Sequence, residues 1–151
     1  YTFLAANGEA TGSSLVEPDR IEDARRMRAR AEERGCTLLL PTDHVVADKL
    51  AEGASSEIVE TIPDGMMGVD IGPATTARYA EAAASAKTIL WNGPMGVFEI
   101  DAFARGTEGV AKAVAASPAR SIVGGGDSLA ADVSGSASIF ASGAERRMVR
   151  V

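Results

Sequence analysis

The sequence predicts an α/β fold in which helices pack on a parallel sheet. Short apolar runs alternate along the chain with longer stretches of helical periodicity, an order typical of parallel sheets covered by helices. Glycine-rich segments directly follow two of the apolar runs. The 151 residues, 46% of them hydrophobic and 24% charged, are enough for one domain with a core of its own.

The first expected helix covers Glu17–Arg34. Pro18 suits the first helical position, and Gly35 is a natural stop. Acidic residues crowd the start and arginines crowd the end, which complements the helix dipole. An apolar stripe at helical spacing is formed by Ile21, Ala24, Met27 and Ala31.

The other expected elements follow from apolar runs, periodicity and turn residues. They are a buried strand Cys36–Leu40, a short strand Glu57–Glu60, a loop with a short extended piece Ile62–Gly72, a helix Pro73–Ala86, a strand Lys87–Trp91, a loop Asn92–Glu99, a helix Ala102–Ala116, a strand Ser121–Val123 and a helix opening at Asp127–Ala131. Asp101 is expected to cap the helix that follows it. The inward face of that helix is expected to carry Phe103, Val110, Ala111 and Val114.

Composition narrows the possible functions. The chain has a net charge of −6, so it lacks the excess of basic residues that is typical of a general nucleic-acid binder. No apolar run is long enough to span a membrane. Cys36 is the only cysteine, so we expect a buried, inert thiol in a protein of the reducing cytoplasm. His44, the only histidine, is expected to be structural. Because Tyr1–Gly8 contains neither an initiator Met nor a signal-peptide pattern, we expect part of a longer protein.

A glycine-rich segment, Gly124–Ser128, follows the strand Ser121–Val123 and precedes a helix. Glycines allow a ligand to approach the backbone, and the free N–H groups of a helix start bind anions. Asp127 offers the oxygen ligand that Mg²⁺ prefers, so the segment predicts a site for phosphate with a metal. A tight strand-to-helix turn with Asp127 as a cap is the alternative. The segment matches neither the P-loop pattern nor the dinucleotide fingerprint.

A second candidate segment, Asn92–Glu99, also follows an apolar run. Ligands of parallel α/β sheets bind beyond the carboxyl ends of the strands, so the two segments are expected to face one crevice. Pro94, Met95, Gly96 and Val97 suit a flat apolar wall for a base, while Asn92 suits a phosphate and Glu99 a ribose hydroxyl. The alternative is an ordinary loop, and for Trp91 and Phe98 a place in the core is preferred.

These segments resemble the phosphoglycerate kinase family. Trp91–Glu99 (WNGPMGVFE) and Gly124–Ser128 (GGGDS) are similar to its two best-known signatures. Supporting stretches occur in the family's order, namely Tyr1–Leu4, Leu40–Asp43, Val45–Asp48, Ile62–Gly65, Gly68–Pro73 and Phe103–Thr107. The resemblance covers residues 1–131, and residues 132–151 form a divergent tail.

The resemblance implies a three-layer, Rossmann-like fold and an incomplete C-terminal, nucleotide-binding domain over residues 1–151. It implies that the cofactor is Mg²⁺ with ADP or ATP, and that Asp127 binds the metal. Nucleotide would be bound by Asn92, Pro94, Gly96, Val97, Glu99, Gly124, Gly125, Gly126, Asp127 and Ser128. The catalytic contribution would come from Gly125 and Gly126, through positioning and charge stabilisation of the transferring phosphoryl group.

The implied activity is a glycolytic kinase reaction between 1,3-bisphosphoglycerate and ADP. Phosphoglycerate would bind only through the family's N-terminal domain, and the family's second glycine triplet is not found in Phe140–Arg147. We therefore expect negligible turnover from this chain alone, with a non-catalytic nucleotide-binding module or a nonfunctional truncated product as alternatives. The expected protein is cytoplasmic, has no nucleic-acid or membrane partner, and belongs to a family that is usually monomeric.

Overall fold

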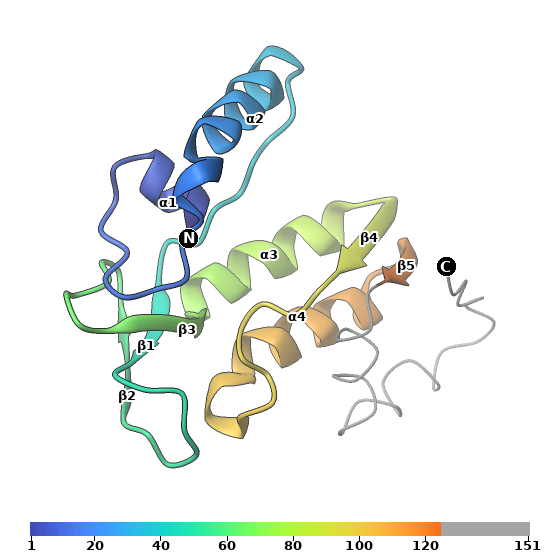
Figure 1. Cartoon of the computed structure of the whole chain (residues 1–151). Helices are drawn as coiled ribbons and strands as arrows, with labels where there is room; N and C mark the ends of the chain where they lie inside the picture. The colour runs from blue at the N-terminus through green and yellow to red at the C-terminus, as the bar shows by residue number, and fades with distance from the viewer. Residues whose placement is uncertain (125–151) are drawn as a thin grey trace. The chain divides into compact units, whose positions relative to one another are not determined.

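The computed structural model describes residues 1–124, which fall into two compact units (Figure 1). The first unit is Tyr1–Thr75, and the second begins at Thr76. Among residues 1–124, no helix has both the length and the apolar character needed to cross a membrane.

The first unit opens with helices. α1 covers Thr2–Ala6, a 3-10 turn covers Pro18–Arg20, and α2 covers Ile21–Glu33. The predicted helix Glu17–Arg34 is thus confirmed, with Pro18 at the start of the turn. One member of its expected apolar stripe is wrong: Met27 is 60% exposed, whereas Ala24 is buried.

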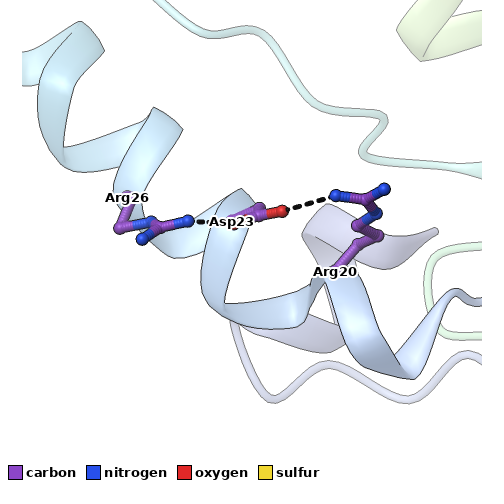
Figure 2. A network of polar contacts seen from close by, with 3 residues as sticks. All are labelled: Arg20, Asp23 and Arg26. Carbon is purple, nitrogen blue, oxygen red and sulfur yellow. Dashed lines mark hydrogen bonds and ion pairs between the residues drawn. The ribbon is translucent and has the colours of Figure 1, made fainter.

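Charged side chains line the outside of α2. Asp23 accepts hydrogen bonds from Arg20, at 3.0 Å, and from Arg26 (Figure 2). These two bonds lower the pKa of the Asp23 carboxyl. Because both arginine side chains are exposed to solvent, the network contributes little to stability.

A three-stranded antiparallel sheet forms the core of the first unit. β1 (His44–Ala47) lies between β2 (Ser56–Val59) and β3 (Met67–Ile71). β2 confirms the strand expected at Glu57–Glu60, and β3 is the extended piece expected within Ile62–Gly72. The unit's buried apolar side chains are Leu4, Ala24, Val46, Ala47, Ile62, Val69 and Ile71.

Two expectations for the segment before this sheet are wrong. Cys36–Leu40 is not a strand but an irregular, largely exposed segment, and the strand begins instead at His44. Without a strand at Cys36–Leu40 to bury it, the Cys36 thiol is exposed rather than buried.

A buried carboxylate fixes the start of α3 (Pro73–Ser85), the predicted helix Pro73–Ala86. Asp43 accepts hydrogen bonds from the backbone N–H of Ala74 at 2.9 Å and from that of Thr75 at 2.7 Å. The Thr75 hydroxyl donates a third, at 2.6 Å. Asp43 therefore caps a helix that begins 30 residues later in the chain, satisfying N–H groups that have no partner within the helix.

Gly72 makes the close approach of Asp43 possible. A Cβ at residue 72 would lie 2.2 Å from the Asp43 carboxyl, too near for any real side chain. The carboxylate cannot easily move away because it is buried and held by three donors. Glycine at this position is therefore part of the cap.

The first unit should lose stability in mild acid because of His44. The pKa of this histidine is lowered, and burial is the largest cause. The charges of Asp43 and Glu9 act to raise the pKa, and the terminal ammonium acts to lower it further. The buried Nδ1 atom has no hydrogen-bond partner among the described residues. A pKa below the unfolded value of about 6.5 means that the unfolded state binds the proton first. Stability is then fully present above about pH 6.5 and falls as the pH drops through the folded pKa.

We expect urea unfolding of the chain to show this loss between pH 7.5 and pH 5.5, with a slope of at most about 1.4 kcal/mol per pH unit from this one group. A His44→Phe variant keeps a ring at the position but cannot titrate. Its stability should change less over the same range, and an equal slope in both proteins would assign the loss to other groups.

The second unit contains the remaining elements. β4 (Thr88–Asn92) and β5 (Arg120–Gly124) pair in parallel. α4 (Arg105–Ala116) lies between these two strands in the sequence. The expected strands Lys87–Trp91 and Ser121–Val123 are confirmed, with each end displaced by one residue. The parallel pairing confirms the expected α/β fold, to which the antiparallel sheet adds a feature that the sequence analysis did not anticipate.

The helix expected at Ala102–Ala116 is divided. A 3-10 turn at Asp101–Phe103 precedes α4. The residue before the turn is Ile100 and the residue before α4 is Ala104, so the expected cap at Asp101 is wrong. The inward face of the helix is as predicted, since Phe103, Val110, Ala111 and Val114 are all buried.

Two close contacts join α4 to the part of α3 that belongs to the second unit. A Cβ at Gly109 would lie 2.5 Å from the Thr76 methyl group, so the helices touch there. The Ser117 hydroxyl at the end of α4 donates a hydrogen bond to the Ala83 carbonyl at 2.7 Å. α4 is thus fixed at both contacts.

Candidate functional site

The carboxyl ends of β4 and β5 bring two predicted site residues together. The strands run in register from Thr88 opposite Arg120 to Asn92 opposite Gly124. A Cβ built at Gly124 would lie 3.4 Å from Asn92 Oδ1, an ordinary contact distance, so the two residues are direct neighbours. Asn92 and Gly124 therefore share the edge where ligands of parallel sheets bind.

The loop after β4 is held by backbone hydrogen bonds. The N–H of Phe98 donates to the Gly96 carbonyl at 2.9 Å, and the N–H of Ile100 donates to the Val97 carbonyl at 3.1 Å. Gly93 has a φ of 122°, a conformation that side chains other than glycine rarely adopt. The loop therefore needs glycine at residue 93 and forms two short turns between Gly96 and Ile100.

The predicted ligand-binding side chains of this loop differ in exposure. Asn92 and Glu99 are exposed, whereas Pro94, Gly96 and Val97 are half-buried. Polar groups thus point to solvent at the two ends of the loop, and an apolar stretch lies between them. This is the distribution expected of a loop that contacts both the flat base and the polar parts of a nucleotide.

Two aromatic residues flank the loop. Trp91 is buried with 7% of its surface exposed, as expected, and Phe98 is half-buried. The Trp91 indole N–H has no hydrogen-bond partner in the described part of the chain. Because Trp91 is the only tryptophan, its fluorescence reports on the environment beside this loop.

The rest of the second glycine-rich segment lies outside the described residues. This applies to the predicted phosphate, magnesium and catalytic residues Gly125, Gly126, Asp127 and Ser128. Within residues 1–124, no group of three or more His, Cys, Asp or Glu side chains is arranged to hold a metal ion. The magnesium site therefore stays a prediction that rests on Asp127.

One residue at this edge was missed by the sequence analysis. Thr107, in the first turn of α4, is 2% exposed, and its hydroxyl accepts a hydrogen bond from the Met95 N–H at 3.0 Å. The sequence does carry a signal for it. Thr107 falls on the apolar stripe between Phe103 and Val110, where a polar side chain needs a partner.

Comparison with known proteins identifies the family. The family model for phosphoglycerate kinase matches residues 1–138. The chain belongs to the phosphoglycerate kinase family. The phosphoglycerate kinase of Rubrobacter xylanophilus is 57% identical over 133 residues, which are 87% of this chain and 33% of that protein. That of Clostridium botulinum is 56% identical over the same shares of the two proteins.

Solved structures agree. The phosphoglycerate kinase from Coxiella burnetii superposes with a TM-score of 0.88 at 44% identity, covering 92% of this chain and 36% of that one. The enzyme from Pyrococcus horikoshii gives a TM-score of 0.71 at 30% identity, covering 99% of this chain and 36% of that one. The chain therefore has the fold of part of a phosphoglycerate kinase and spans about a third of the length of the curated relatives that it matches.

Proposed function

We propose that this chain is the nucleotide-binding part of a phosphoglycerate kinase and binds ADP or ATP together with Mg²⁺. The observation that carries the proposal is the register of β4 and β5, which makes neighbours of Asn92 and Gly124 at the carboxyl edge of the parallel strands. Each of these residues opens one of the two glycine-containing segments. Two such segments side by side can both contact one bound ligand.

The segment Asn92–Glu99 is proposed to bind the base and the ribose of the nucleotide, and to contact a phosphate through Asn92. Asn92 donates from its amide to a phosphate oxygen, and Glu99 accepts from a ribose hydroxyl. Pro94 and Val97, with Gly96 between them, flank the adenine ring. The exposure of Asn92 and Glu99 and the partial burial of the apolar residues support this division of roles.

The segment that begins at Gly124 is proposed to bind the phosphates and the metal. Backbone N–H groups of Gly124, Gly125, Gly126 and Ser128 cradle the phosphates, and the Asp127 carboxylate holds the magnesium that accompanies them. Gly124 fits this role because it stands at the end of β5 directly opposite Asn92. When bound, magnesium neutralises charge that develops on the phosphates during transfer.

The proposed reaction is phosphoryl transfer between 1,3-bisphosphoglycerate and ADP in glycolysis, in the cytoplasm. The acceptor oxygen is already anionic, so the residues here position and stabilise rather than remove a proton. Gly125 and Gly126 contribute by placing N–H groups near the transferring group. Phosphoglycerate is proposed to be bound by residues outside these 151, so the chain alone should turn over negligibly in a coupled kinase assay.

An ADP titration tests the nucleotide site. We expect calorimetry to detect ADP binding to the folded chain in the presence of Mg²⁺ and weaker binding in its absence. Asn92→Ala and Glu99→Ala each remove one hydrogen bond to the ligand and should weaken binding about five- to tenfold. Glu57→Ala, at an exposed carboxylate on β2, is the matched control and should bind as the unaltered chain does. A folded chain that gives no heat with MgADP would exclude the proposed site.

A further inference from the structure

A buried hydroxyl on α4 reaches into the middle of the loop Asn92–Glu99. The Thr107 hydroxyl oxygen lies 3.0 Å from the Met95 backbone nitrogen and accepts its hydrogen bond. Thr107 is almost completely buried, at 2% exposure. Because this hydrogen bond is partly buried, its loss would cost about 1 kcal/mol.

Within residues 1–124, the first half of the loop has few other hydrogen bonds to fix its shape. Pro94 has no N–H to donate, and Gly93 has the wide conformational freedom of glycine. The two short turns of the loop begin at Gly96 and Val97, and both lie after Met95. In the part of the chain that the structure describes, the bond to Thr107 therefore ties the Gly93–Met95 stretch to a helix.

The helix that provides this connection is itself firmly packed. Val110, Ala111 and Val114 follow Thr107 on the buried face of α4. Gly109 lies against Thr76, and Ser117 is hydrogen-bonded to Ala83. A loop anchored to such an element is more precisely placed than one held only by its own turns.

We propose that Thr107 is a positioning residue for nucleotide binding, an inference that rests on the proposed function of the loop. By holding the Met95 backbone, it keeps Pro94 and Val97 in the arrangement that receives the base before the nucleotide arrives. Such preorganisation increases affinity because less order has to be gained on binding. Thr107 acts through Met95 and does not itself touch the ligand.

The test compares three substitutions in the full 151-residue chain. Thr107→Val keeps the shape of the side chain and removes the acceptor, Thr107→Ala removes it without placing a second methyl group in the buried site, and Thr107→Ser keeps the hydroxyl. We expect the valine and alanine variants to speed hydrogen exchange at the Met95 amide at least tenfold and to weaken MgADP binding about five- to tenfold. Thr107→Ser should restore both measurements.

Ser117→Ala is the matched control for general destabilisation. It removes a partly buried hydrogen bond at the other end of α4, away from the loop. It should lower the melting temperature about as much as Thr107→Val does, but leave the Met95 exchange rate and the MgADP affinity unchanged.

The outcomes separate the two proposals. Unaltered MgADP affinity or unaltered Met95 exchange in Thr107→Val and Thr107→Ala would overturn the positioning role alone. Weakened MgADP binding in Ser117→Ala would show that general destabilisation of α4 is enough to weaken binding, and would also overturn the positioning role of Thr107. Absence of MgADP binding by the unaltered, folded chain would overturn the proposed function and the positioning role together.

Discussion

Asp43→Ala is expected to lower the free energy of unfolding of the first unit by about 3 kcal/mol. The substitution removes a buried carboxylate that accepts three hydrogen bonds, at 2.6 to 2.9 Å, from Ala74 and Thr75. Two backbone N–H groups at the start of α3 and one hydroxyl would lose their acceptor. An ordinary helix cap contributes about 1 kcal/mol, and the charge and burial of Asp43 raise that figure.

Hydrogen exchange and urea unfolding followed by circular dichroism measure this effect. Exchange at the Ala74 and Thr75 amides should accelerate most, because these groups donate directly to Asp43. Asp48→Ala, at an exposed carboxylate four residues after β1 begins, is the control and should change stability by less than about 0.5 kcal/mol. An Asp43→Ala chain as stable as this control would show that the cap contributes nothing.

The acid dependence of the cap has a defined sign. Burial acts to raise the pKa of Asp43, but the hydrogen bonds from Thr75 and Ala74, together with His44, outweigh it and lower the pKa. The contribution of the cap is therefore present above the ordinary carboxyl pKa and is lost as the pH falls through the lower folded value. It should survive the mild acid that protonates His44.

Local signals in the sequence predicted the helices well. Pro18 and Pro73 stand at the starts of their helical segments, and the apolar stripe of α4 gave its buried face correctly. Such features depend on neighbours within two turns of the chain. The Asp43 cap could not be predicted in this way, because the carboxylate and the helix that it caps are 30 residues apart.

Strand prediction failed where the outcome depended on partners. Cys36–Leu40 has an apolar run of the same length as that of β1, yet only β1 pairs with strands on both sides. The four residues of β1 are short enough that periodicity cannot identify them. What makes them a strand is pairing with β2 and β3, which follow later in the chain and supply the hydrogen bonds.

The candidate site was predictable in part. The rule that ligands bind at the carboxyl ends of parallel strands predicted that two glycine-containing segments would meet, and Asn92 and Gly124 are indeed neighbours. Thr107 was missed because its hydrogen bond to Met95 joins two elements whose relative placement the sequence does not state. The family-specific roles of the site residues came from resemblance and stay predictions.

Phe103→Ala should destabilise the second unit by about 3–5 kcal/mol. Phe103 is completely buried in the turn before α4, and its N–H donates to the Ile100 carbonyl at 2.8 Å. Truncation removes most of the side chain and leaves a cavity that the surrounding backbone can fill only in part. Since small domains are stable by only about 5–15 kcal/mol, a loss of this size would leave the unit marginal.

Trp91 fluorescence during urea unfolding measures this loss within the same unit. Leu90→Ala is the matched control, because it also truncates an apolar side chain but at a position that is 72% exposed. It should cost less than about 1 kcal/mol, and equal losses in the two variants would mean that burial of Phe103 is not what stabilises the unit. Phe103 also precedes Thr107 by one helical turn. Faster exchange at Met95 in Phe103→Ala would then show that the core under α4 supports the loop as well as the fold.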